Sequence, residues 1–107
     1  MGVAETIREQ LGRMALMMMG AKSFVKGTDD KGCEYLSFRI MKNKSKINYI
    51  KITLNFLDLY DIEFGYIYGG NFTIKSASPN TFVGDMHSVI EDATGLYLSL
   101  GSIREDN

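Results

Sequence analysis

One histidine and one cysteine are the residues that could support nucleophilic chemistry. His87 follows the apolar Met86, and Cys33 lies where a predicted turn passes into a strand. A cysteine–histidine pair acts only when the two side chains lie within hydrogen-bond reach, and their spacing does not predict that contact. Separate structural roles for the two residues are therefore the favoured interpretation.

Three carboxylates form the best candidate for a metal site. Asp58, Asp61 and Glu63 lie close together, and Asp61 and Glu63 point to one face of a predicted strand. Mg²⁺ binds one or two carboxylates together with water or phosphate, so a metal-dependent phosphodiester hydrolase is one alternative. The lysine that usually accompanies such pairs in nucleases is missing, and solvating charge on an open sheet face is the favoured interpretation. No phosphate-binding loop is found, and no cofactor is expected.

Tyrosine, lysine and arginine residues form the candidate binding surface. The predicted strands place several of them on one outward face, beside a lysine-rich hairpin. Aromatic rings among cations can stack bases while the cations neutralise phosphates. Ordinary cross-strand pairing on a solvated face explains the same residues, and a protein partner suits them equally. The candidate residues are Tyr35, Arg39, Lys42, Lys44, Lys46, Tyr49 and Lys51.

The net charge of −1 conceals an uneven distribution of charge along the chain. Residues 22–51 carry eight basic and three acidic side chains, whereas residues 52–107 carry two basic and eight acidic ones. Such asymmetry indicates an electrostatic partner or head-to-tail self-association. Loops and strand edges also need solvating charge, which explains the pattern without a partner.

The length and composition predict one domain over residues 1–107. The chain has 107 residues, 45% of them hydrophobic, which is enough for one core. A single cysteine excludes an internal disulfide bond. The longest apolar run, residues 14–19, is far shorter than the ~20 residues of a membrane-spanning helix, and no basic segment precedes it as in a signal peptide. A cytoplasmic protein that makes no membrane contact is expected.

Hydrophobic periodicity predicts a helix near each end and four strands between them. The first helix has an apolar stripe from Ile7 to Met18 and ends at Gly20. The last helix begins at Pro79, with Ser78 as its N-cap, and ends at Gly95. Residues 21–25 are left open as a short extended piece, and residues 96–100 as a strand or a packed segment. The strands are predicted at residues 35–40, 47–54, 60–68 and 72–75.

Hairpins between consecutive strands imply an antiparallel meander. A lysine-rich connection joins the first two strands, and Gly69 and Gly70 predict a tight turn between the last two. The two helices would cover one face of the sheet. The expected fold is therefore a two-layer α+β domain with a four-stranded meander, in the order α-β-β-β-β-α.

Several stretches of the chain resemble a family of small proteins from phages and mobile elements of gut bacteria. They are residues 20–24 (GAKSF), 43–48 (NKSKIN), 54–55 (LN), 58–61 (DLYD), 63–64 (EF) and 94–100 (TGLYLSL). The methionine-rich stretch after Leu11 departs from the family pattern. The family has no assigned activity, so the resemblance carries over no functional residue. It implies a mobile-element setting, in which small non-enzymatic proteins often inhibit host defence machinery such as CRISPR nucleoproteins.

The leading hypothesis is a non-enzymatic binding module of a phage or mobile element. It would inhibit a host nucleic-acid-handling or CRISPR-type complex through the basic sheet face, with a protein or nucleoprotein partner and direct nucleic-acid contact as a further option. Two alternatives stay open. One is the hydrolase built on the acidic residues, and the other is a self-assembling structural protein whose basic and acidic halves meet between copies.

Overall fold

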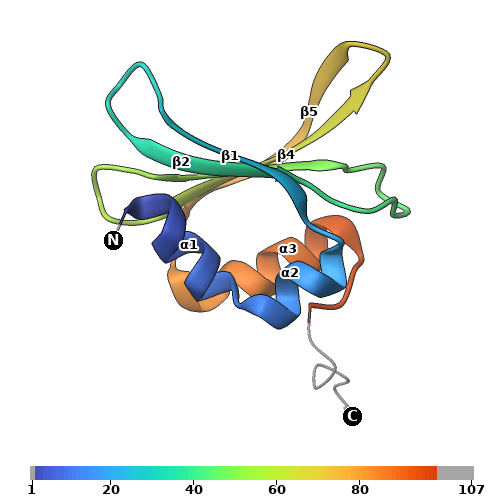
Figure 1. Cartoon of the computed structure of the whole chain (residues 1–107), viewed down its shortest axis with the longest axis horizontal. Coiled ribbons are helices and arrows are strands. Elements are labelled where there is room, and N and C mark those ends of the chain that lie inside the picture. Colours follow the sequence, from blue (N-terminus) through green and yellow to red (C-terminus); the bar gives the residue numbers. More distant parts are fainter. Residues whose placement is uncertain (1, 99–107) are drawn as a thin grey trace.

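The computed structural model describes residues 2–98, which form a twisted antiparallel sheet with helices packed on one face (Figure 1). The α+β class and the meander are confirmed, but the sheet has five strands rather than the predicted four, in the order β1-β2-β3-β4-β5. The strands are β1 (Lys22–Thr28), β2 (Glu34–Arg39), β3 (Tyr49–Leu54), β4 (Tyr60–Tyr68) and β5 (Asn71–Thr81).

The additional strand, β1, lacks the apolar alternation that marks its neighbours. It is an edge strand, and five of its seven residues are exposed. Its pairing with β2 is interrupted between Lys22 and Val25, where Ser23 adopts a φ of 57°. A strand that buries so little carries no hydrophobic period in its sequence, which is why only a short extended piece was predicted there.

The helical layer comprises α1 (Val3–Leu11), α2 (Arg13–Met19), the 3₁₀ turn η1 (Val83–Asp85) and α3 (Met86–Thr94). The single N-terminal helix predicted from the sequence is split at Gly12, whose φ of 89° and ψ of 152° are not helical. Glycine adopts this conformation without a steric penalty. The Gly12 N–H donates to the Arg8 carbonyl and its own carbonyl accepts from Leu16, so both helices are capped at the break.

The predicted start of the last helix at Pro79 is wrong. Strand β5 continues through Pro79 to Thr81, and α3 begins only at Met86. Because β5 is an edge strand, the missing N–H of proline costs little there. The predicted helix end is confirmed, since Gly95 is a left-handed C-cap. Residues 96–98 form no strand, and residues 99–100 of that segment lie outside the described residues.

The core lies between the helices and the inner face of β2, β3 and β4. The predicted alternation of these strands is confirmed, because the inward residues are buried. No helix within residues 2–98 is long and apolar enough to cross a membrane. Fully buried core side chains include Phe38, Ile50, Ile52, Ile62 and Phe64 from the sheet and Ile7, Leu11, Met19, Met86 and Ile90 from the helices.

Candidate functional site

Four predicted binding residues lie on the sheet face that the helices leave open. Arg39 lies opposite Tyr49 in the register, and Lys51 lies opposite Ser37, beside Tyr35. The Lys51 Nζ sits 4.4 Å from the centroid of the Tyr35 ring, which is a cation–π distance. The Arg39 Nε donates to the Asn48 carbonyl at 3.3 Å. These side chains share one face, as the strand alternation predicted.

The same sheet face also carries acidic side chains. Glu63 lies opposite Lys51 in the register, and Asp61 lies opposite Thr53. The face is therefore mixed in charge along β3 and β4, and it is basic only toward the end where Arg39 lies. This distribution limits how far the sheet face itself acts as a cationic surface.

The three carboxylates of the candidate metal site do not converge. Asp58 is exposed in the β3–β4 turn with a φ of 62°. The Asp61 Oδ1 accepts hydrogen bonds from the Asn55 side chain at 3.0 Å and from the Asn80 N–H at 2.9 Å, which ties the turn to β5. Within residues 2–98, no group of three or more His, Cys, Asp or Glu side chains could hold a metal ion, so Asp58, Asp61 and Glu63 do not make a site together.

Cys33 and His87 make separate contacts. Burial and the nearby Asp29 carboxylate raise the pKa of the Cys33 thiol, which disfavours the reactive thiolate. The His87 Nε2 lies 2.7 Å from the Leu11 carbonyl, so this nitrogen carries the proton and joins α3 to the end of α1. In the described part of the chain, no hydrogen bond links the two side chains.

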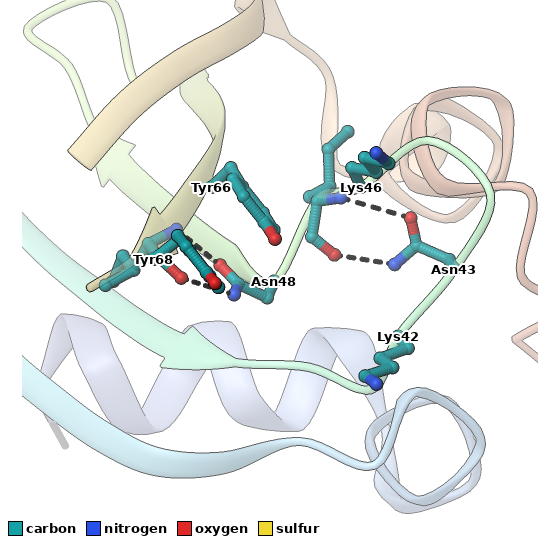
Figure 2. A pocket seen from close by; sticks show the side chains of 8 residues that line it. Lys42, Asn43, Lys46, Asn48, Tyr66 and Tyr68 are labelled. Atoms are coloured by element: carbon teal, nitrogen blue, oxygen red, sulfur yellow. Dashed lines mark hydrogen bonds between the residues drawn. The ribbon is translucent and has the colours of Figure 1, made fainter. Parts of the chain in front are cut away.

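Two of the predicted lysines line a pocket of about 430 Å³ between the β2–β3 loop and the β4–β5 hairpin. Figure 2 shows the tyrosines of β4 on one wall and Lys42 and Lys46 on the loop opposite. Lys44 is exposed on the same loop but is not part of the lining. The lining residues are Lys42, Asn43, Lys46, Ile47, Asn48, Tyr66, Ile67 and Tyr68.

Two asparagine side chains hold the walls of this pocket in place. The Asn48 amide bonds Ile67 as a neighbouring strand would, accepting from its N–H at 2.8 Å and donating to its carbonyl at 2.9 Å. The Asn43 amide bonds Ile47 in the same way, with its Oδ1 and Nδ2 at 3.2 and 2.6 Å (Figure 2). The Asn43 bonds therefore close the loop on itself, and the Asn48 bonds tie the end of the loop to β4.

The aromatic wall consists of Tyr66 and Tyr68, which the sequence analysis did not include in the site. Their rings are nearly parallel, with 5° between the planes and 6.1 Å between the centroids. Strand β4 passes beyond its last pair with β3 at Gly65, and the hairpin projects away from the helices (Figure 1). Tyr66 lies on the face of β4 that carries the buried Ile62 and Phe64, but it is only partly buried, because the hairpin projects away from the helices (Figure 1).

A two-residue turn completes the hairpin. Gly69 and Gly70 have φ values of 58° and 85°, and Tyr68 pairs with Asn71 across them. Two successive positive φ angles are the signature of a type I′ turn, so the predicted tight turn is confirmed. A Tyr-x-Tyr pair directly before two glycines was the signal in the sequence that could have located this wall.

In the folded chain, charge is also divided between the two ends of the sheet. In a meander, the β2–β3 loop and the β4–β5 hairpin lie at one end, and the β1–β2 and β3–β4 turns lie at the other. The segments at the first end, residues 39–49 and 64–75, contain five basic and no acidic residues. Those at the second end, residues 29–34 and 55–61, contain five acidic residues and one basic residue. We call these the basic end and the acidic end.

At the acidic end, Asp29 organises the β1–β2 turn. Its Oδ1 accepts from the N–H groups of Lys31 and Cys33 at 3.0 and 2.9 Å, and these bonds lower the pKa of the Asp29 carboxyl. We expect Asp29→Ala to lower the free energy of unfolding at pH 7, and Asp29→Asn to lower it less, because the amide oxygen still accepts.

The pH dependence of this contribution has a definite sign. Since the folded-state pKa lies below the unfolded value of about 3.9, the charged carboxylate stabilises the fold above that pH. The contribution is lost as the pH falls through the folded-state pKa. Urea unfolding at neutral and acidic pH measures this contribution. A difference in the free energy of unfolding between wild type and Asp29→Asn that grows on acidification would contradict it.

No family model, curated protein or solved structure matched the chain when it was compared with known proteins. The geometry and charge of the basic end are therefore the observations that bear on function.

Proposed function

We propose that the chain is a non-enzymatic binding module that contacts the nucleic acid of a nucleoprotein complex through its basic end. The observation that carries the proposal is the composition of that end. Five basic residues and two stacked tyrosines stand there, and the segments that build it contain no acidic side chain.

Within the described residues, no salt bridge joins the lysines at this end to an acidic side chain that would compete with phosphate. Within residues 2–98, the salt bridge that forms joins Lys26 to Glu5, away from the basic end. Lys42, Lys44 and Lys46 are all exposed on one loop. Cations that neutralise phosphates release condensed counterions, which supplies most of the affinity of sequence-independent binding.

Aromatic residues at the same end favour nucleic acid over a simple polyanion. Besides the tyrosine pair, Tyr49 meets the half-exposed Phe72 edge to face, with 5.2 Å between the centroids. Exposed aromatic rings beside cations are the combination with which proteins hold single strands. The resemblance to proteins of phages and mobile elements supports a role for the module as an inhibitor of a host nucleic-acid-handling or CRISPR-type complex.

The proposal is tested by the salt dependence of binding. Fluorescence anisotropy would follow a labelled single strand of about 12 nucleotides titrated with the whole chain. If three to five cations contact phosphates, the logarithm of the association constant falls with the logarithm of salt at a slope of about −2 to −3.5. Saturable binding with such a slope supports the proposal. Binding that is absent, or that does not change with salt, overturns it.

The opposite charges of the two ends also favour head-to-tail association of the chain with itself, which is a second candidate function. The two candidates differ in the oligomeric state that they predict at low salt without nucleic acid. Light scattering in the absence of nucleic acid reports self-association directly, and a monomer at low salt contradicts the second candidate.

A further inference from the structure

We infer that the pocket at the basic end holds one nucleotide of a single strand, with its base against the tyrosine pair and its phosphates toward the loop that carries Lys42 and Lys46. We further infer that it does so without regard to base identity. The inference rests on the proposed function and names the ligand of its site. Four features of the pocket carry it: its size, its aromatic wall, its cationic wall and the occupation of its amide groups.

The size and position of the pocket suit a single unpaired base. About 430 Å³ lies between the loop and the hairpin, and the pocket is open to solvent at the basic end of the sheet. A volume of this order accommodates a small organic ligand such as a nucleotide. A base inside a duplex is stacked on both faces and cannot enter without being flipped out, at a cost in free energy.

The aromatic wall presents a flat, accessible surface. The Tyr68 side chain is 71% exposed, and its ring lies nearly parallel to that of Tyr66. The two-residue turn sets the register of the strand that carries both rings, with Tyr68 paired to Asn71. Base–aromatic stacking tolerates any base, because every base has a π-face.

The cationic wall faces these rings across the pocket (Figure 2). Lys46 adopts a φ of 55° and its N–H donates to the Asn43 carbonyl at 3.1 Å, so the loop backbone at this position is fixed in the left-handed region. Lys42 lies on the other side of the same loop. A strand whose base lies on the tyrosine wall would present its phosphates to this loop, where the two lysines flank the pocket.

The two side-chain amides in the lining, which could read a base edge, are already occupied. The Asn43 and Asn48 amides bond Ile47 and Ile67 through both their oxygen and their nitrogen atoms. The backbone N–H and carbonyl groups of those two isoleucines are engaged by the same bonds. The pocket is left with ring faces, tyrosine hydroxyls and ammonium groups, and the stacking and charge neutralisation that these supply act on every base.

The test compares Tyr68→Ala with wild type on intact and abasic single strands of equal length, by anisotropy at one salt concentration. Loss of stacking should raise the Kd for intact strands about 5- to 150-fold and leave the Kd for abasic strands nearly unchanged. Tyr68→Phe, which keeps the ring, should bind as wild type does. Tyr97→Ala is the matched control, since Tyr97 is a tyrosine of similar exposure, 67%, in the C-terminal segment.

Further arms of the experiment define the ligand. Single strands made of one base only, in RNA and in DNA, should differ in Kd by no more than about threefold from one base to another. A duplex of the same length should bind more weakly than the single strands. A base preference above about tenfold overturns the inference, and so does an equal loss on intact and abasic strands. Both results leave the proposed function in place, because that function fails only if wild type shows no salt-dependent binding to any strand.

Discussion

Replacing Lys42, Lys44 and Lys46 together by alanine is expected to weaken binding of a single strand about 100-fold at roughly 0.1 M salt. Each lost phosphate contact reduces the magnitude of the slope of log K against log salt by about 0.7. The slope should therefore become less negative by about 2 for the three lysines. The three side chains are exposed, and the fold should therefore tolerate their removal. Anisotropy titrations at several salt concentrations measure both quantities.

A charge-matched control separates this site from a general effect of net charge. Arg13, Lys26 and Lys31 are also exposed but lie outside the basic end, and replacing all three changes the net charge by the same amount. Lys26 loses its exposed salt bridge with Glu5, which contributes little to stability. We expect this variant to bind within a few-fold of wild type. Equal loss of affinity in the two triple variants would show that the lysine loop is not the binding site.

Phe64→Ala is expected to lower the free energy of unfolding by about 3–5 kcal/mol, the usual cost of removing a buried phenylalanine ring. Phe64 is 1% exposed and lies on β4, paired with Ile50 of the neighbouring strand. Much of the stability of a domain of this size would be lost, so partial unfolding at 37 °C is the expected consequence. Urea unfolding followed by circular dichroism measures the change.

Tyr68→Ala, on the same strand, should leave the stability of the fold nearly unchanged. Its ring is largely exposed, so the free energy of unfolding should change by less than about 0.5 kcal/mol. This contrast allows the Tyr68 variant to report on binding without a folding defect. If Tyr68→Ala destabilised the protein as much as Phe64→Ala, the hairpin would have to belong to the core rather than to a projecting binding surface.

The parts of the fold that were predictable are those in which one pattern decides the structure. The central strands alternate apolar and polar residues, and burial of one sheet face follows directly from that period. Gly69 and Gly70 could be assigned to a turn because their backbone freedom is needed there. The placement of Arg39 and Tyr49 on one sheet face followed from the alternation, whereas their pairing is a matter of register that the structure supplies.

Other features depend on contacts that the sequence does not display. Strand β1 is held by pairing with β2 rather than by burial, so it leaves no hydrophobic period. Pro79 is as compatible with an edge strand as with the first turn of a helix, and the neighbouring chain decides between them. Gly12 also depends on its surroundings. It separates α1 from α2, although the apolar residues of the two helices continue one helical period.

The candidate site was only partly predictable for a related reason. The local density of lysine pointed to Lys42 and Lys46. Tyr66 and Tyr68 line the same pocket because β4 extends beyond its last pair with β3 into the β4–β5 hairpin. The separation of charge between the ends depends on the meander, which brings residues 39–49 and 64–75 together. The carboxylates that were close in sequence, Asp58, Asp61 and Glu63, do not converge in space.

The most direct test of the central claim is a map of the bound surface by NMR. The backbone amides of the whole chain would be followed as a short single strand is added. We predict saturable shifts concentrated in residues 39–49 and 64–75, with the amides of residues 29–34 and 55–61 nearly unmoved. Shifts centred on the acidic end, or no saturable shifts at all, would contradict the assignment of the basic end as the nucleic-acid-binding surface.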